Sequence, residues 1–203
     1  VRVVRDDQGN DIKHYYPYYN GEEEVIKIRD VIKKRNNEPF QFVWTDGSSK
    51  VDLFGKQLFE EGQRYITLFE GEIDAMSGYQ MLNAKGTNFP AIGVKSSSDA
   101  ERAVRKNLDY LYSFENVVLC FDMDEPGRKA TEKVARLLKT GKTKIVTLPA
   151  EYNDVNEMLM AGKQQEFKDA WFGAKTYTPS GLVSVSDQKD RYLDRPKKLS
   201  IPF

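Results

Sequence analysis

The hydrophobic positions of this chain change their spacing near residue 64. Before that point, short runs rich in β-branched and aromatic residues alternate with turn signals at residues 8–10, 20–21, 36–37 and 46–47. Short strands joined by tight turns are typical of an antiparallel meander. The predicted strands cover residues 1–5, 12–19, 24–29 and 40–44. We therefore expect residues 1–64 to form a small, mainly antiparallel α+β subdomain.

From residue 65 onward, apolar runs of strand length alternate with segments of helical period. The predicted strands are 65–69, 90–94, 116–121 and 144–148. The predicted helices are 73–84, 98–112, a segment that starts near Pro126, 155–160 and 164–172. Strands and helices that alternate with short connections favour a parallel sheet with helices on both faces. The fold class predicted for residues 65–173 is therefore α/β.

Two of these helices carry more detailed expectations. The helix at 73–84 is predicted to bury one apolar face, formed by Ile73, Met76, Tyr79 and Leu82. The helix at 98–112 is predicted to open with a capping box made by Ser98 and Glu101. After residue 173 the periodicity fades, and residues 174–203 carry six basic residues against three acidic ones. We expect a linker there.

Composition excludes several kinds of site. The 31 basic and 31 acidic residues cancel, so only a local basic surface would indicate nucleic-acid binding. One cysteine and one histidine are too few for a disulfide framework or a zinc site within the chain. No apolar stretch approaches the roughly 18 residues of a membrane span. We expect a cytoplasmic protein without membrane contact and, because the chain starts at Val1, a piece of a larger one.

Acidic residues follow three of the predicted strands. Glu70 and Asp74 come after the strand at 65–69, Asp122 and Asp124 after the strand at 116–121, and Asp154 after the fourth strand. The carboxyl ends of parallel strands lie together, beside the crevice where α/β proteins bind ligands. Clustered carboxylates at such an edge are typical ligands of Mg²⁺, whose coordination is completed by phosphates and water. The sequence therefore predicts a magnesium site there.

The segments that carry these acids resemble a known family. The sequence EGEID at 70–74, FDMDEPGRKA at 121–130 and DVNE at 154–157 resemble the signature of the Toprim domain. The sequence KVDLFGKQLF at 50–59 is similar to the segment before the Toprim core in the primase half of phage primase–helicases. SGLVS at 180–184 resembles the entry to their linker. The resemblance implies a basic N-terminal subdomain at 1–64, a Toprim catalytic core at 65–173 and a linker toward a helicase domain at 174–203.

The resemblance also implies an activity. It indicates a DNA primase of phage replication, that is, a DNA-directed RNA polymerase that joins ribonucleotides into short primers with Mg²⁺ or Mn²⁺. By resemblance, Asp122, Asp124 and Asp154 face the metal, and Glu70 is a metal ligand or a general base. Asp74 is expected to support the site.

Basic residues near these motifs are candidates for binding nucleotides or template. Five of the nine residues from 27 to 35 are positively charged, and this run resembles the basic region of primases. A run of charges is also often an ordinary solvated surface, and positive residues at a helix start can either meet phosphates or face solvent. The candidates are Lys27, Arg29, Lys33, Lys56, Lys95, Arg128 and Lys129.

Other residues are expected to be structural. Glu72 is interpreted as a surface carboxylate, and Asn156 and Glu157 as residues that cap or brace a short helix. The tyrosines at 15–19 are expected to pack on the meander rather than to stack on bases. Cys120 is expected to be a buried strand residue rather than a nucleophile.

The partners implied by the resemblance are those of primer synthesis. They are a single-stranded DNA template, ribonucleoside triphosphates, a hexameric helicase, a zinc-binding module and a replicative DNA polymerase, in the cytoplasm of a bacterial host. The chain lacks a phosphate-binding P-loop motif, so it carries no helicase motor of its own. Two alternatives stay open: a non-catalytic, primase-like DNA-binding module of a hexameric helicase, and a Toprim nuclease.

Overall fold

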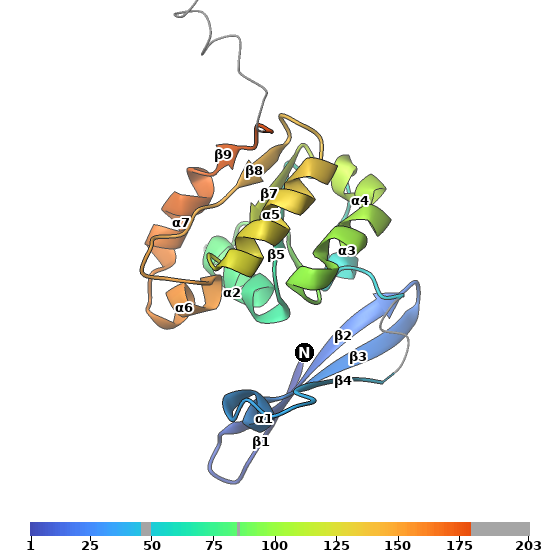
Figure 1. Cartoon of the computed structure of the whole chain (residues 1–203), viewed down its shortest axis with the longest axis vertical. Coiled ribbons are helices and arrows are strands. Elements are labelled where there is room, and N and C mark those ends of the chain that lie inside the picture. The colour runs from blue at the N-terminus through green and yellow to red at the C-terminus, as the bar shows by residue number, and fades with distance from the viewer. Residues whose placement is uncertain (46–49, 85, 180–203) are drawn as a thin grey trace, which may run out of the picture.

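The computed structural model describes residues 1–45, 50–84 and 86–179. These residues form two sheets, one antiparallel and one mostly parallel, which lie in separate parts of the molecule (Figure 1). The predicted fold class, an α/β core with a smaller antiparallel part before it, is confirmed. No helix in the described ranges is long and apolar enough to span a membrane.

The N-terminal sheet is a meander of four strands. Its strands β1 (Arg2–Arg5), β2 (Asp11–Asn20), β3 (Glu23–Asp30) and β4 (Phe42–Trp44) pair antiparallel in the order of the chain. Gly9 and Gly21 have positive φ angles of 85° and 63°, which allow the two tight turns. A short helix, α1 (Val31–Arg35), connects β3 to β4 and is capped by Asp30. The turn predicted at 46–47 lies outside the described residues.

The second sheet contains five strands in the order β6-β5-β7-β8-β9. The first four, β5 (Tyr65–Phe69), β6 (Ala91–Gly93), β7 (Asn116–Cys120) and β8 (Thr143–Ile145), are mutually parallel where they pair. The short β9 (Lys175–Thr176) pairs antiparallel with β8. The segment expected to be a linker, 174–203, therefore begins with two residues that still pair with the sheet. The SGLVS segment lies outside the described residues.

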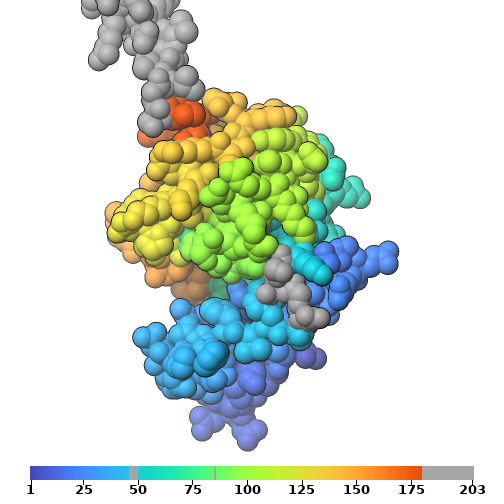
Figure 2. All heavy atoms as spheres, turned by 45° about the vertical axis from the view of Figure 1, so that its right-hand side comes forward, coloured from blue at the N-terminus to red at the C-terminus, as the bar shows by residue number. Residues whose placement is uncertain are grey.

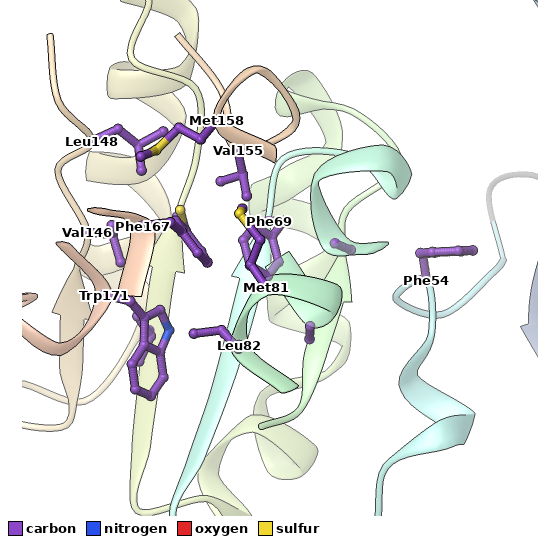
Figure 3. Close-up of a cluster of buried hydrophobic side chains, with 14 of the residues drawn as sticks. Phe54, Phe69, Met81, Leu82, Val146, Leu148, Val155, Met158, Phe167 and Trp171 are labelled. Carbon is purple, nitrogen blue, oxygen red and sulfur yellow. The ribbon is translucent and has the colours of Figure 1, made fainter. Parts of the chain in front are cut away.

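Six helices cover the two faces of this sheet. One face is covered by α2 (Glu72–Asn83), α6 (Val155–Met160) and α7 (Gln164–Phe172), and the other by α3 (Ala100–Lys106), α4 (Leu108–Ser113) and α5 (Glu125–Leu137) (Figure 1). The side chains of β5 alternate between two buried clusters, with Phe69 in one and Ile66 and Leu68 in the other. Figure 3 shows the first cluster, where side chains of α2, α6 and α7 meet the sheet.

Two predictions about helices were wrong. The segment 98–112 is not one helix with a capping box, because a 3₁₀ turn at Ser97–Asp99 precedes α3 and the helix breaks at Asn107. The predicted inward face of α2 was wrong at Tyr79, which is exposed, whereas Leu82 is buried and Ile73 and Met76 pack against the core. Gly78 lies at the centre of that face, and a Cβ there would overlap the ring of Phe69. Because glycine has no side chain to count as apolar, the hydrophobic pattern did not reveal this contact.

The N-terminal sheet packs on the parallel core through aromatic residues. Tyr16 and Tyr18 of β2 are fully buried, and both rings contact Phe54. Phe54 in turn exchanges two backbone hydrogen bonds with Gly93 at the end of β6, over 2.8 and 3.0 Å. The two tyrosines therefore pack, as expected. The N-terminal sheet is held against the core at the carboxyl edge of the parallel sheet (Figure 2).

Candidate functional site

A cleft of about 520 Å³ lies between the two sheets. Its lower wall comes from β3, α1 and β4, and its upper wall from the segments that follow β5, β6 and β7. The residues that line it are Lys27, Arg29, Lys34, Phe42, Trp44, Glu70, Gly71, Glu72, Ile73, Asp74, Lys95, Ser96, Ser97 and Asp122. The predicted ligand edge of the parallel sheet thus faces the N-terminal sheet, and one wall is acidic while the other is cationic.

Glu70 and Asp122 end two neighbouring strands and contact each other. The backbone N–H of Asp122 donates to Oε2 of Glu70 over 3.2 Å, and the hydroxyl of Ser97 also hydrogen-bonds to Glu70. Gly127, in the first turn of α5, makes this approach possible. A Cβ at that position would overlap the carbonyl oxygen of Asp122 and lie 2.8 Å from Oε2 of Glu70. The glycine of the EPGRKA segment is therefore required by close packing beneath the acids.

Asp74 and Asp154 are joined through the start of α6. Oδ1 of Asp74 accepts the backbone N–H of Asn156 over 3.1 Å, and Oδ1 of Asp154 accepts that of Glu157 over 2.7 Å. The side chain of Asn156 accepts a hydrogen bond from Ser77 of α2. Asn156 thus braces the helix as predicted, and it ties the loop after β8 to the acid at the start of α2.

Asp124 occupies a different position from the other acids. It is exposed, and its Oδ1 caps α5 by accepting the N–H of Gly127 over 2.7 Å. Neither Asp124 nor Asp154 lines the cleft itself. The loop that carries Asp124 is nevertheless held beside that of Asp154, because the N–H of Met123 donates to the carbonyl oxygen of Asn153 over 2.8 Å.

The acids influence one another electrostatically. Burial, followed by repulsion from Glu70, Asp74 and Asp154, raises the pKa of Asp122 to about 8. Burial and then repulsion from Asp154 raise the pKa of Asp74 to about 6. Burial also raises the pKa of both Glu70 and Asp154. A proton or a cation at this point of the cleft would relieve the repulsion.

Whether a divalent metal ion fits this site depends on the negative charge of the acids and on the type of atom that would bind it. In the described part of the chain, no three acidic side chains are arranged as a ready-made ligand set. The donors are all carboxylate oxygens, which Mg²⁺ prefers. Burial raises the pKa values of Asp74 and Asp122 first, and the repulsion between the carboxylates, which raises them further, is what a cation would neutralise. The carboxylates therefore fit such an ion in chemistry and charge. To coordinate it together, their side chains would have to rotate toward one point.

The cationic wall faces these acids. Lys27, Arg29 and Lys34 line the cleft on this wall, and Lys95 lines it on the opposite wall, after β6. Lys34 was not among the predicted site residues. Burial lowers the pKa of Lys95, and the carboxylate of Asp99 at 3.6 Å opposes that shift. The Nε of Arg29 is buried and has no hydrogen-bond partner among the described residues. Such a donor at a cleft wall is suited to an anionic ligand.

Lys27 does not lie on an exposed surface. It is 5% exposed, and its ammonium donates to Oε1 of Glu72 over 2.7 Å and to the carbonyl oxygen of Lys95 over 2.8 Å. Glu72 is itself buried and also accepts the hydroxyl of Tyr18. The interpretation of Glu72 as a surface carboxylate was therefore wrong. This buried ion pair joins β3 of the smaller sheet to the start of α2 in the core.

Four other basic candidates do not line this cleft. Lys56 is held by Asp52 and by the side-chain carbonyl of Asn107, at 3.2 and 2.9 Å. Lys129 pairs with Glu125 on the surface of α5, and Arg128 donates to a backbone carbonyl in the acidic loop. Lys33 is in α1, on the same helix as Lys34. A role for these four in binding nucleotides or template stays a prediction.

Two aromatic residues of the cleft were missed. Phe42 and Trp44 line the lower wall, but the run at 40–44 was interpreted only as a strand. Their alternate positions in that run were the available signal, since residues i and i+2 of a strand share one face. Which face would meet the acids depended on pairing across the sheet, and this could not be inferred from the run alone.

Comparison with known proteins identifies the core. The Toprim-like family model matches residues 67–159. A DNA helicase/primase of Enterobacteria phage T3 is 34% identical over 178 residues, which are 87% of this chain and 29% of the relative. The chain thus spans less than a third of the length of that curated relative.

Two solved structures from bacteriophage T7 extend the comparison. The primase fragment of the T7 primase-helicase protein has a TM-score of 0.67 and 30% identity, covering 83% of this chain and 65% of that chain. The second structure contains lagging-strand DNA polymerase interacting with primase domains bound to an RNA/DNA hybrid and dTTP. It matches with a TM-score of 0.69 and 30% identity, over 86% of this chain and 83% of the matched chain. With its Toprim-like core and the carboxylates that end its strands, the chain belongs to the family of phage primase domains.

Proposed function

We propose that this chain synthesises short RNA primers on a single-stranded DNA template in phage DNA replication. The reaction is the joining of ribonucleoside triphosphates by ribonucleotidyl transfer. The observation that carries the proposal is the cleft itself, in which carboxylates at the ends of β5 and β7 face a wall of lysine and arginine side chains. An acidic pole and a cationic pole in one cleft suit a metal-bound triphosphate and a phosphate backbone.

The acids would hold a divalent metal ion, Mg²⁺ or Mn²⁺. Asp122, Asp124 and Asp154 are the proposed ligands, with Glu70 as a further ligand or a general base. When bound, the metal would supply binding of the triphosphate, activation of the attacking 3′-hydroxyl and stabilisation of the leaving pyrophosphate. Asp74 supports the site, since its carboxylate receives the backbone N–H of Asn156.

The basic residues of the cleft would take the phosphates. Arg29 has a buried guanidinium nitrogen without a protein partner among the described residues, and Lys34 is exposed on α1 beside it in the cleft lining. Lys95 lies on the opposite wall, after β6. Lys27 would not bind phosphate itself, because its charge is already paired with Glu72. Its role would be to hold β3, the strand that also carries Arg29, in place against the core.

The proposal includes the partners of a primase. The T7 domains named above were seen with a DNA polymerase and an RNA/DNA hybrid, and the T3 relative is a helicase/primase. We propose that this chain likewise works with a hexameric helicase, a zinc-binding module and a replicative DNA polymerase, in the host cytoplasm. Residues 1–64 would be the basic template-binding subdomain, 65–173 the catalytic core and 174–203 the linker toward the helicase.

The test is extension of a short oligoribonucleotide on a DNA template with labelled ribonucleotides and Mg²⁺. Wild-type protein should extend it, and the variant Asp122→Asn/Asp124→Asn should not, although its fold survives. Glu132→Gln is the matched control, because Glu132 is an exposed carboxylate of α5 that pairs with Arg136 and does not line the cleft. Full activity in the double variant would contradict the assignment of the acids.

The same reaction, repeated with a labelled template strand, separates the two alternatives. A Toprim nuclease would shorten the labelled template strand, and a non-catalytic helicase module would bind it without changing it. The relatives are named as primases, and this does not favour either alternative.

A further inference from the structure

The aromatic residues of β4 have no role in the function described so far. Phe42 is 41% exposed, and Trp44 is partly buried, yet both line the cleft with the acids. Single exposed apolar side chains are common on protein surfaces. Two rings on one face of one strand, inside a cleft whose other side chains are mostly charged or polar, require a more specific explanation.

The two rings are held in place by neighbouring side chains. The ammonium of Lys27 lies 4.6 Å from the centre of the Phe42 ring and 5.8 Å from that of Trp44. The ammonium of Lys95 lies 5.7 Å from Trp44, and the ring of the buried Tyr18 is 5.0 Å from it. Cation–π contacts and a packed neighbour restrict both rings. A ligand that stacks on them therefore meets an already ordered surface.

We propose that Phe42 and Trp44 form a stacking platform for an unpaired nucleobase. The phosphates attached to that base would lie toward Arg29 and Lys34 of the same wall. This inference rests on the proposed function for the class of ligand, and it adds which side chains hold the base. Because every base has a π face, the platform should accept different bases with similar affinity.

The base can come from the template strand or from a ribonucleoside triphosphate. Both present the same chemistry, an aromatic base joined to phosphates. An experiment with two ligands, oligothymidylate and ATP, distinguishes these sources.

Tryptophan fluorescence measures the stacking directly. The chain has two tryptophans, and Trp171 is buried in the core, where its N–H donates to Thr67 over 3.0 Å. In the variant Trp171→Phe, the emission reports on Trp44 alone. Titration with the ligand that supplies the stacked base should quench this emission. Wild-type protein is titrated in parallel, so that a loss of stability in the variant does not decide the result.

Substitution of Phe42 tests the contribution of the ring. Phe42→Leu keeps an apolar side chain but removes the π face, and it should weaken binding of the responsible ligand about 5- to 150-fold. Phe42→Tyr should bind as the wild type does. Val43→Thr is the control, because Val43 is also exposed on β4 but does not line the cleft.

The binding titrations are made without primer synthesis, so they can fail independently of the catalytic proposal. Quenching by one ligand together with weaker binding in Phe42→Leu supports the platform and names the source of the base. Unchanged affinity in Phe42→Leu for both ligands, or no quenching of Trp44 by either, would overturn it. A protein that binds and quenches but extends no primer would contradict the proposed function and leave the platform standing.

Discussion

The buried pair of Lys27 and Glu72 allows a quantitative prediction about how the two sheets are joined. The ammonium and the carboxylate are 2.7 Å apart, with side chains only 6% and 8% exposed. Tyr18 donates a further hydrogen bond to the same carboxylate, and Lys27 also donates to the carbonyl of Lys95. The perturbation is to neutralise each partner alone, by Lys27→Met or Glu72→Gln, and then both together.

The expected magnitudes follow from the burial of both groups. Either single substitution leaves one charge buried without its partner, which costs about 3–5 kcal/mol of unfolding free energy. Glu72→Gln should be at the lower end, since its amide oxygen can still accept from Tyr18. The double variant removes both charges and should lose only about 1–2 kcal/mol, the contribution of the remaining hydrogen bonds. It should therefore be more stable than either single variant.

Urea denaturation followed by circular dichroism measures these differences. The slope of the transition must stay constant if the free energies are to be compared. The exposed pair of Glu125 and Lys129, at 2.5 Å with side chains 71% and 68% exposed, is the control. Neutralising it should change the stability by less than about 1 kcal/mol. Single variants at Lys27 and Glu72 that cost no more than this control, or a double variant whose loss equals the sum of the two, would refute the reasoning.

Three other predictions concern the acidic and cationic walls. The pKa of Asp122 is about 8 in the folded protein and 3.8 when unfolded, so the folded state binds the extra proton. Metal-free protein should therefore lose stability as the pH rises from about 4 to 8, and Asp122→Asn should flatten this dependence in thermal melts with chelator; equal slopes would contradict it. Arg29→Gln and Lys34→Gln should each reduce the salt dependence of binding single-stranded DNA by about one unit of slope; unchanged slopes would mean that neither contacts phosphate. Gly127→Ala should cost about 1–3 kcal/mol in urea denaturation, because its Cβ overlaps the Asp122 carbonyl oxygen; a wild-type midpoint would show that α5 can shift.

The acidic side of the site could be predicted because it depends on local pattern. Apolar runs mark β5 and β7, and in a parallel sheet their carboxyl ends must meet, which places Glu70 beside Asp122. Short-range rules were sufficient here.

The opposite wall could not be predicted in this way. Glu72 is a charged residue in the first turn of a helix, a position that is usually exposed. Its burial depends on Lys27 and Tyr18, which are 45 and 54 residues away. Phe42 and Trp44 reach the cleft only because β4 pairs with β3. The break at Asn107 has a similar origin, since its side chain accepts a hydrogen bond from Lys56, 51 residues earlier. These features arise from packing between distant segments.

The central claim is that the carboxylates after β5, β7 and β8 form a site for a divalent cation. Binding of Mn²⁺, counted by electron paramagnetic resonance of the free ion, tests it without reference to activity. The wild-type chain and Glu132→Gln should bind Mn²⁺ more tightly as the pH rises toward 8, because the metal must displace the proton of Asp122. Asp122→Asn/Asp124→Asn should lose this binding. Equal Mn²⁺ binding by the wild type and the double variant would contradict the account.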